Sequence, residues 1–266
     1  MSDLSGKVVL IVGGSTGLGL SAAKAFVEAE GRIGIIGRNS DRIDEALGVL
    51  GDTAIGYCGD ARDPSTVPAA IERLAEQFGS LTGLYHVAGG SGRLMGDGPL
   101  HELTDEGWEA TIRLNLTSVI YSNRAAVRYF RENRCSGSVL NCGSVLGYAP
   151  VPNHFSTHAY AAAKAGLIGL TRSCAATYAA EGIRFNLVAP ALVATPMSKR
   201  AQSNETIMGY AKQKQPLAEE GIADAGDVDG AATYFMSDGS RGVTGQILGV
   251  DWGWAVSEGA SEGKVK

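Results

Sequence analysis

Short runs of β-branched residues alternate with longer segments of helical periodicity along almost the whole chain. The first run, residues 7–12 (KVVLIV), ends at a pair of glycines, as a buried strand does before a tight turn. Apolar residues then recur at Leu20, Ala23, Phe26 and Val27, which is the spacing of one helix face. Strands that are joined through helices run parallel, so the repeated pattern predicts an α/β fold: a doubly wound parallel sheet with helices on both faces.

The expected elements keep this order to the end of the chain. Strands are predicted at 7–12, 32–36, 53–58, 81–87, 138–142, 183–188 and 246–250. Helices are predicted at 17–30, 40–50, 64–78, 104–132, 158–181 and 227–236. Either Ser40 or Asp41 is the expected N-cap of the second helix, and residues 190–216 are expected to form a looser connection. Ligands of such sheets bind beyond the carboxyl ends of the strands, so motifs at those ends are the functional candidates.

The length and composition fit one domain. The chain has 266 residues, 44% of them hydrophobic, and shows no linker, low-complexity tract or internal repeat. We expect a single dinucleotide-binding and catalytic domain over residues 1–255, followed by a polar tail over 256–266. The net charge of −5 leaves no excess of lysine and arginine, which argues against nucleic acid as the main partner.

Cysteine usage and the N-terminus point to the cytoplasm. No two of the four cysteines have CxxC spacing, so free thiols in a reducing compartment and no metal site are expected. The first residues lack the apolar core of a signal peptide, and no apolar run reaches the roughly 18 residues of a membrane span. We therefore expect a cytoplasmic protein with no membrane partner.

A glycine-rich turn joins the first strand to the first helix: Gly13-Gly14-Ser15-Thr16-Gly17-Leu18-Gly19. Glycines in this place permit positive φ and let the backbone approach a pyrophosphate, whose charge the helix N-terminus stabilises. A tight turn without a ligand is the alternative. The position of the turn after the first strand of a doubly wound sheet favours a nucleotide site.

The end of the second strand bears on which nucleotide binds. An NAD site places a carboxylate about 20 residues beyond the glycines, to accept from the ribose 2′-hydroxyl. The window here reads Ile35-Ile36-Gly37-Arg38-Asn39 and contains no carboxylate. Arg38 can instead pair with a 2′-phosphate for which Gly37 leaves room, although a solvated loop arginine is the alternative. Asp60, at the end of the third strand, is a candidate partner for the adenine amino group.

Tyr160 and Lys164 lie four residues apart on a predicted helix and therefore share a face. Acid–base work near neutral pH requires the tyrosine pKa to fall by about two to three units from its usual value near 10. A lysine ammonium at about 4 Å provides about 4 kcal/mol at an effective dielectric of 20, but only about 1 kcal/mol in water. The pair therefore works only where it is partly desolvated.

Together these motifs resemble the short-chain dehydrogenase/reductase family, in its shorter soluble subgroup with a Rossmann-type sheet. The resemblance runs from about Lys7 to Gly253 and keeps the family's order of motifs. It implies hydride transfer between a nicotinamide cofactor and a carbonyl or alcohol carbon, with Tyr160 as the acid–base residue. The implied catalytic residues are Asn115, Ser144, Tyr160 and Lys164. The implied cofactor-binding residues are Gly13, Ser15, Thr16, Gly17, Leu18, Gly19, Arg38, Asp60, Ala88, Gly89, Tyr160, Lys164, Pro190, Val193 and Thr195.

The chain departs from the family pattern in several places. Val12 replaces a threonine before the glycine turn, Ala191 replaces a glycine, and His86-Val87 replaces an Asn-Asn pair. His86 could be a catalytic imidazole, but a hydrogen-bonded structural role at a strand end is the favoured interpretation. Ser144 and Tyr160 are 16 residues apart, longer than is usual in the family, which predicts an enlarged loop over 148–157.

The window without a carboxylate and Arg38 favour NADP as the cofactor, with NAD as an alternative. The helices expected at 104–132 and 158–181 carry more apolar and small residues than one sheet face can cover, and the family typically pairs them across subunits, so we expect a homotetramer. The sequence does not identify the small-molecule substrate, whose contacts are expected from residues 90–103, 148–157 and 196–216. These loops carry Leu94, Met95, Tyr148, Phe155, Met197 and Met208. Two other functions stay open. One is a 3-oxoacyl carrier-protein reductase that docks its acidic partner on Arg124, Arg128 and Arg131, and the other is a catalytically silent nucleotide sensor.

Overall fold

A computed structural model describes residues 3–152 and 154–258. Seven parallel strands form one sheet in the order β3-β2-β1-β4-β5-β6-β7. The strands are β1 (Val8–Val12), β2 (Arg32–Gly37), β3 (Ala54–Cys58), β4 (Gly83–His86), β5 (Gly137–Cys142), β6 (Ile183–Pro190) and β7 (Ile247–Val250). The strand order reverses at β1, whose neighbours are β2 and β4, and such a reversal opens a crevice beyond the strand ends. The predicted doubly wound parallel sheet is confirmed.

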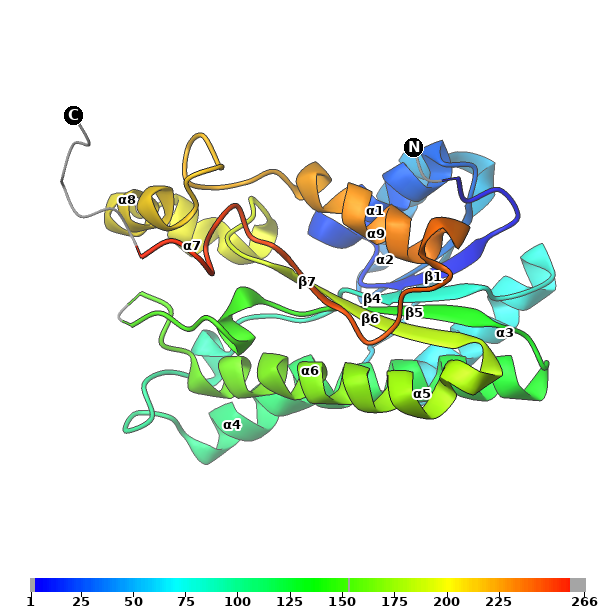
Figure 1. Ribbon diagram of the computed structural model, residues 1–266, viewed down its shortest axis with the longest axis horizontal. Coiled ribbons are helices and arrows are strands. Elements are labelled where there is room, and N and C mark those ends of the chain that lie inside the picture. The colour runs from blue at the N-terminus through cyan, green and yellow to red at the C-terminus, as the bar shows by residue number, and fades with distance from the viewer. Residues whose placement is uncertain (1–2, 153, 259–266) are drawn as a thin grey trace.

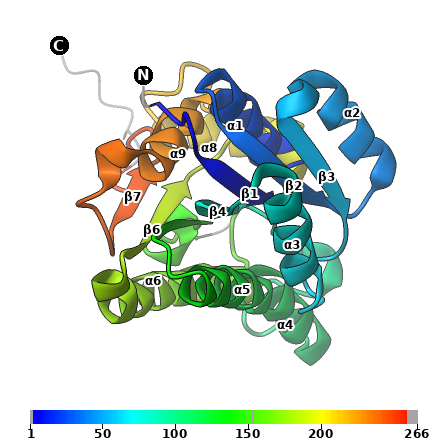
Figure 2. The ribbon, with the colours of Figure 1, turned by 90° about the vertical axis from the view of Figure 1, so that its right-hand side faces the viewer.

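Helices cover both faces of the sheet, as Figure 2 shows with the sheet seen between two layers. One layer contains α1 (Gly17–Glu28), α2 (Ser40–Leu50) and α9 (Asp229–Met236). The other contains α3 (Thr66–Phe78), α4 (Asp105–Ile112), α5 (Ser118–Glu132) and α6 (His158–Tyr178). No helix in the described part of the chain has both the length and the hydropathy to span a membrane.

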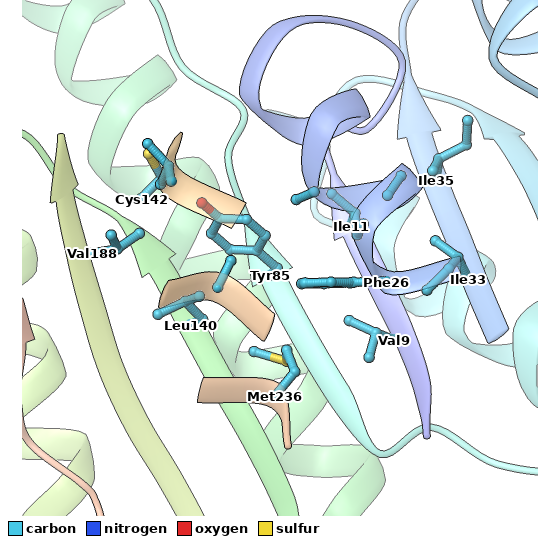
Figure 3. Packing of buried hydrophobic residues seen from close by; sticks show 14 of the residues in the cluster. Val9, Ile11, Phe26, Ile33, Ile35, Tyr85, Leu140, Cys142, Val188 and Met236 are labelled. Atoms are coloured by element: carbon cyan, nitrogen blue, oxygen red, sulfur yellow. The ribbon is translucent and has the colours of Figure 1, made fainter. Parts of the chain in front are cut away.

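Each face of the sheet buries its own hydrophobic core. On the α1 side, Phe26 and Met236 pack against β4 and β5, with the rings of Phe26 and Tyr85 6.4 Å apart (Figure 3). On the α5 side, Phe130 and Phe185 are fully buried among residues of α3 and of the strands. Residues of β1 alternate between the two cores, because successive side chains of a strand point to opposite faces. The sheet is therefore held rigidly, and its carboxyl edge is a fixed platform.

Several boundaries and caps of the predicted helices differ in the structure. The N-cap of α2 is Asn39, whose side chain accepts from the Arg42 amide at 2.9 Å, and not Ser40 or Asp41. The predicted helix at 104–132 is divided by a π-helical turn, η3 (Arg113–Thr117). Helix α3 begins two residues later than predicted, and α6 ends at Tyr178 in a short 3₁₀ turn.

The region 190–216 is more ordered than the sequence indicated. It contains α7 (Lys199–Gln202) and α8 (Glu205–Lys214), and the N-cap Asn204 accepts from the Ile207 amide at 3.0 Å. Ile207 and Ala211 form a small apolar cluster with Leu192, which gives α8 a buried face that its sequence showed only weakly. Residues 259–266 of the predicted polar tail lie outside the described residues.

Candidate active site

A cavity of about 480 Å³ opens at the carboxyl ends of the strands. The turn after β1, the end of β2 and the segments after β4, β5 and β6 form its wall. In Figure 1 these strand ends lie on the side of the molecule that carries α7 and α8. Of the predicted site residues, all but Gly19 and Asn115 line the cavity. In the described part of the chain, no cluster of three His, Cys, Asp or Glu side chains could hold a metal ion.

The glycine turn is shaped by close backbone contacts. Gly13 has φ +91°, and a Cβ there would lie 2.7 Å from the Ala88 amide nitrogen. A Cβ at Gly19 would lie 2.1 Å from the Gly13 carbonyl oxygen, so α1 starts directly against the turn. The N-cap Thr16 makes no side-chain capping bond, which leaves the first amides of α1 without that partner. These amides and the helix dipole fit a pyrophosphate.

The end of β2 borders the same part of the cavity. A Cβ at Gly37 would lie 2.7 Å from the Ser15 hydroxyl oxygen, so the end of β2 packs closely against the glycine turn and a larger residue there would displace the Ser15 side chain. Arg38 is exposed and lines the cavity. Arg42, in the first turn of α2, also lines the cavity there. The sequence analysis missed it, although its place three residues after the N-cap Asn39 was a usable signal.

Asp60 lies at the cavity wall but its carboxylate already has a partner. Both of its oxygens contact the Arg62 guanidinium, with distances of 2.6–3.0 Å, and Oδ1 also accepts from the Arg62 amide. This hydrogen bonding holds the pKa of Asp60 below its usual value. A contact of Asp60 with an adenine amino group would therefore share the carboxylate with Arg62.

Ser144, Tyr160 and Lys164 meet at the inner end of the cavity. Ser144 follows β5, and its hydroxyl accepts from the Leu146 amide at 3.2 Å. Tyr160 and Lys164 lie on one face of α6, with Lys164 Nζ 5.6 Å from the centre of the tyrosine ring. Lys164 Nζ donates to the Cys142 carbonyl oxygen at 2.7 Å, so β5 fixes the position of the ammonium group.

The electrostatics of this group follow from burial. Burial raises the pKa of Tyr160 above its usual value, while a hydrogen bond with the Ser144 side chain acts in the opposite direction. Burial lowers the pKa of Lys164. Each charged form is therefore unfavourable alone, but a tyrosinate and an ammonium formed side by side would compensate one another.

Asn115 lies behind the wall and is fully buried. Its side-chain amide donates to the carbonyl oxygens of Gly90 and Thr111 at 3.0 Å, and its Oδ1 accepts from the Gly90 amide at 3.0 Å. It lies in the π-helical turn, and such turns are frequent at functional sites. Asn115 therefore connects the helix to the cavity wall at Gly89 and Gly90.

The surroundings of His86 fit a hydrogen-bonded structural role, which its position at a strand end favoured. Its ring nitrogens contact the Ser122 hydroxyl at 2.8 Å and the Ala88 carbonyl oxygen at 3.0 Å. Burial and the nearby Lys164 lower the pKa of His86 to about 3. The imidazole is thus neutral near pH 7 and does not line the cavity.

The segment after β6 closes the cavity opposite the glycine turn. Pro190 ends the strand, and Val193 forms an isolated parallel bridge with Ala223. A Cβ at Gly17 would lie 3.5 Å from the Thr195 side chain, so the two segments are in close proximity. The Thr195 and Ser198 side chains cap the following turn reciprocally, which fixes the segment.

Asp97 is a residue that the sequence analysis missed. It is 5% exposed, and its two carboxylate oxygens accept from the Ala159 and Tyr160 amides at 3.0 Å. It thereby caps α6 from a distant loop, since the adjacent Thr157 makes no capping bond. No local pattern signals this role, because Asp97 lies 63 residues before Tyr160.

The outer end of the cavity is lined by loops and by the C-terminal segment. Of the six apolar loop residues predicted to contact substrate, Phe155 and Met197 line the cavity, whereas Leu94, Met95, Tyr148 and Met208 do not. Leu94 is fully exposed, and Met208, on α8, packs against the apolar cluster that contains Leu192 and Ala201 of α7. Trp254 is buried at this end, with its ring 5.5 Å from that of Phe155. Arg93 and Arg200 also line the cavity here.

These features are those of a known enzyme family. A family model described as enoyl-(acyl carrier protein) reductase matches residues 12–255. The chain belongs to the short-chain dehydrogenase/reductase family. It is therefore an oxidoreductase that acts on CH–OH or carbonyl groups with a nicotinamide cofactor, as the motifs implied.

Relatives in this family act on varied substrates. The chain is 34% identical over 250 residues to a cis-4-hydroxycyclohexanecarboxylate dehydrogenase of Sinomonas cyclohexanicum, covering 93% of this chain and 96% of the relative. It is 32% identical over 258 residues to a 3-oxoacyl-[acyl-carrier-protein] reductase of Thermotoga maritima, covering 95% and 99%. Its fold matches a short-chain type dehydrogenase/reductase from Mycobacterium ulcerans with a TM-score of 0.87 at 24% identity, covering 97% and 93%.

Proposed function

We propose that this protein is an NADP-preferring alcohol dehydrogenase or carbonyl reductase in which Tyr160 carries the proton. The observation that supports it most is the meeting of Ser144, Tyr160 and Lys164 at the inner end of the cavity that the glycine turn borders. When bound, the nicotinamide cofactor supplies or accepts the hydride. The protein's part is to bind, to orient and to move a proton.

Each residue of the inner group has a separate task. The Ser144 and Tyr160 hydroxyls would hydrogen-bond the reacting oxygen of the substrate, and stabilise the charge that develops on it. Tyr160 would donate its proton in the reducing direction and accept one in the oxidising direction. Lys164, held by the Cys142 carbonyl, would stabilise the tyrosinate. Asn115 would hold the wall at Gly90, where a water-mediated path for the proton can pass.

Cofactor preference would be decided at the end of β2. Arg38 and Arg42 line the cavity there, and the window 35–39 holds no carboxylate to repel a 2′-phosphate. Neither arginine has an ion-pair partner in the described part of the chain. A charge-assisted contact is worth about 1.5–3 kcal/mol, which corresponds to a roughly 10- to 150-fold preference for NADP(H).

The test of cofactor choice is kcat/KM for NADPH and NADH in the wild-type protein and in Arg38→Ala. We expect the preference to fall toward unity in the variant while the NADH value changes little. Equal values in the wild-type protein, or a preference that survives in both Arg38→Ala and Arg42→Ala, would show that the phosphate is bound elsewhere.

The reaction itself is tested by following NADPH absorbance at 340 nm with a panel of ketones. The panel should include 4-oxocyclohexanecarboxylate, because one relative is named for the corresponding hydroxy acid, together with neutral ketones, quinones, steroids and sugars. A wild-type protein that binds NADPH and reduces none of them would favour the catalytically silent alternative.

The acyl-carrier alternative draws support from the Thermotoga maritima relative rather than from the surface of this chain. None of the three arginines on α5 lines the cavity. Arg131 is paired with Glu181 at 2.8 Å, and Arg124 lies 5.2 Å over the Tyr121 ring. A docking surface for an acidic carrier would need these side chains to be available.

We also propose a homotetramer in the cytoplasm. Figure 2 shows α5 and α6 side by side on one face, and their exposed positions include the small residues Ala162, Ala165 and Gly166 and the larger Ile120. Such a flat face suits helix packing between subunits. All four cysteines are free thiols, as a reducing compartment allows. Light scattering after size-exclusion chromatography tests this, and a monomer at micromolar concentration would contradict it.

A further inference from the structure

Two arginines line the cavity at some distance along the chain from the cofactor-binding turn. Arg93 lies in the turn η2 (Arg93–Met95) after β4, and Arg200 lies in α7. Both line the cavity that contains Ser144 and Tyr160. Neither forms an ion pair with any residue that the structure describes. They are separate from Arg38 and Arg42, which lie at the end of β2.

The two guanidinium groups converge on one atom. A terminal nitrogen of Arg93 donates to the His154 carbonyl oxygen at 2.9 Å, and one of Arg200 donates to the same oxygen at 3.0 Å. This oxygen is neutral and takes one of the five N–H donors that each guanidinium carries. The arrangement fixes both groups side by side, with donors left for a further acceptor.

The convergence holds two positive charges close together. Burial and the positive charge of Arg200 both lower the pKa of Arg93. The carboxylate of Asp97 lies near enough to act in the opposite direction, but both of its oxygens accept from amides of α6. Arg93 is half-buried and Arg200 is exposed, and an oxyanion that both can contact would reduce the repulsion between them.

Apolar side chains line the same cavity. Leu146, Phe155 and Trp254 are among its lining residues, and they pack in one apolar cluster. Their side chains suit a hydrocarbon body, such as a ring or a short chain. The cavity therefore combines the Ser144–Tyr160 pair, an apolar cluster and two cationic groups.

We infer that the substrate of this enzyme is a hydroxy or oxo acid whose carboxylate is bound by Arg93 and Arg200. The inference rests on the proposed function for the position of the reacting oxygen at Ser144 and Tyr160. A planar carboxylate matches the guanidinium fork, which a neutral amide of the same size does not.

The experiment compares matched anionic and neutral probes by calorimetry on the protein saturated with NADP⁺. Three pairs are used: cyclohexanecarboxylate, benzoate and hexanoate, each against its carboxamide. We expect wild-type protein to bind at least one carboxylate about 10- to 100-fold more tightly than its amide. This ratio should fall by about tenfold in Arg93→Gln and in Arg200→Gln, and to near unity in the double variant.

Arg241→Gln is the matched control, because Arg241 is exposed and does not line the cavity. Its carboxylate preference should equal that of the wild-type protein. Arg93→Lys and Arg200→Lys keep the charge and should retain part of the preference, which separates charge from packing. Circular dichroism and thermal unfolding check that each variant is folded.

A wild-type protein with no carboxylate preference in any of the three pairs would overturn the inference. So would a preference that persists in the double variant. If the protein reduced neutral ketones and showed no carboxylate preference, the proposed function would stand, but the inference that the substrate is an acid would be wrong. Conversely, a carboxylate preference in a protein that reduces no ketone would count against the proposed function alone.

Discussion

The two ends of the cavity are built in different ways. The cofactor end is formed by the glycine turn and the ends of β1 and β2, where neighbouring backbones are so close that Gly13 and Gly19 have no space for a Cβ. The substrate end is formed by the loop after β4, the loop before α6, the segment with α7 and the C-terminal Trp254. Side chains, rather than backbone packing, give that end its shape and charge.

The residues of the glycine turn are therefore constrained by the packing of the fold, whereas the side chains of the substrate end can vary. A substitution in the turn changes how α1 packs on the sheet, and so affects stability and cofactor binding together. A substitution of Arg93, Phe155 or Arg200 changes a side chain that lines the cavity from a connecting segment or a short helix. Relatives of similar length that act on a cyclohexane acid and on an acyl carrier protein are consistent with this division.

The largest effect is expected for a substitution of Tyr160, which should reduce the rate of the reaction but leave cofactor binding almost unchanged. Tyr160→Phe keeps the ring but loses the ionisable oxygen, so kcat should fall by about 10²- to 10⁴-fold. The Kd for NADPH should change less than about threefold, because the glycine turn lies elsewhere. Stopped-flow rates and fluorescence titration measure the two quantities.

Lys164→Ala is the comparison variant, and should impair both turnover and cofactor binding. A Tyr160→Phe protein that retained more than about a tenth of the wild-type rate would refute the acid–base role of Tyr160.

A pair of glycine substitutions contrasts the two ends directly. Gly19→Ala places a Cβ 2.1 Å from the Gly13 carbonyl oxygen, so α1 must shift. We expect a loss of about 1–3 kcal/mol of stability and at least tenfold weaker NADPH binding. Gly98 lies in the loop after β4, where an added Cβ would have no atom within 4 Å. Gly98→Ala should therefore change both the stability and the affinity for NADPH only slightly. Urea unfolding and cofactor titration on both variants check this, and equal effects would remove the contrast.

A smaller effect is expected where the substrate loop stabilises the catalytic helix. Asp97→Ala removes the acceptors of the Ala159 and Tyr160 amides and should lower the free energy of unfolding by about 1–2 kcal/mol. Because the N-terminus of α6 carries Tyr160, kcat should fall several-fold while the Kd for NADPH stays constant. Asp97→Asn keeps one acceptor and should restore part of both. A variant with wild-type kcat would show that Asp97 supports only the fold.

The same division explains what could be predicted from the sequence. The strands were predicted correctly, and the glycine turn, Arg38 and the Tyr160–Lys164 pair could be proposed as site residues, because period, glycine spacing and helical register are local properties. Asp97, Arg93 and Arg200 were missed because their partners, at His154 and at the start of α6, are distant in sequence. The N-cap of α2 was predicted one or two residues late, at Ser40 or Asp41, because Asn39, Ser40 and Asp41 are all good capping residues.

The smallest expected effect concerns acid stability, and it depends on two groups that do not line the cavity: the buried His86 and the half-buried Asp229. The pKa of His86 is lowered from 6.5 to about 3, so between these values the unfolded chain takes up a proton that the folded chain does not. Acidification therefore destabilises the protein by up to about 1.4 kcal/mol per pH unit through His86. Burial raises the pKa of Asp229 from 3.8 to about 6, although a hydrogen bond from Ser21 opposes this. The folded chain then takes up a proton first, so acidification stabilises it through Asp229.

From about pH 6 to pH 4, His86 and Asp229 change the free energy of unfolding in opposite directions. The contribution of Asp229 is reduced by its partial exposure to solvent. Asp229→Asn removes the stabilising one, so its free energy of unfolding should fall more steeply with acid than that of the wild-type protein. His86→Gln should have the reverse effect, with a shallower fall. Urea unfolding at pH 4, 5 and 6 measures the differences, and the other carboxylates cancel between variants. If the curve for Asp229→Asn ran parallel to that of the wild-type protein, the raised pKa of Asp229 would be wrong.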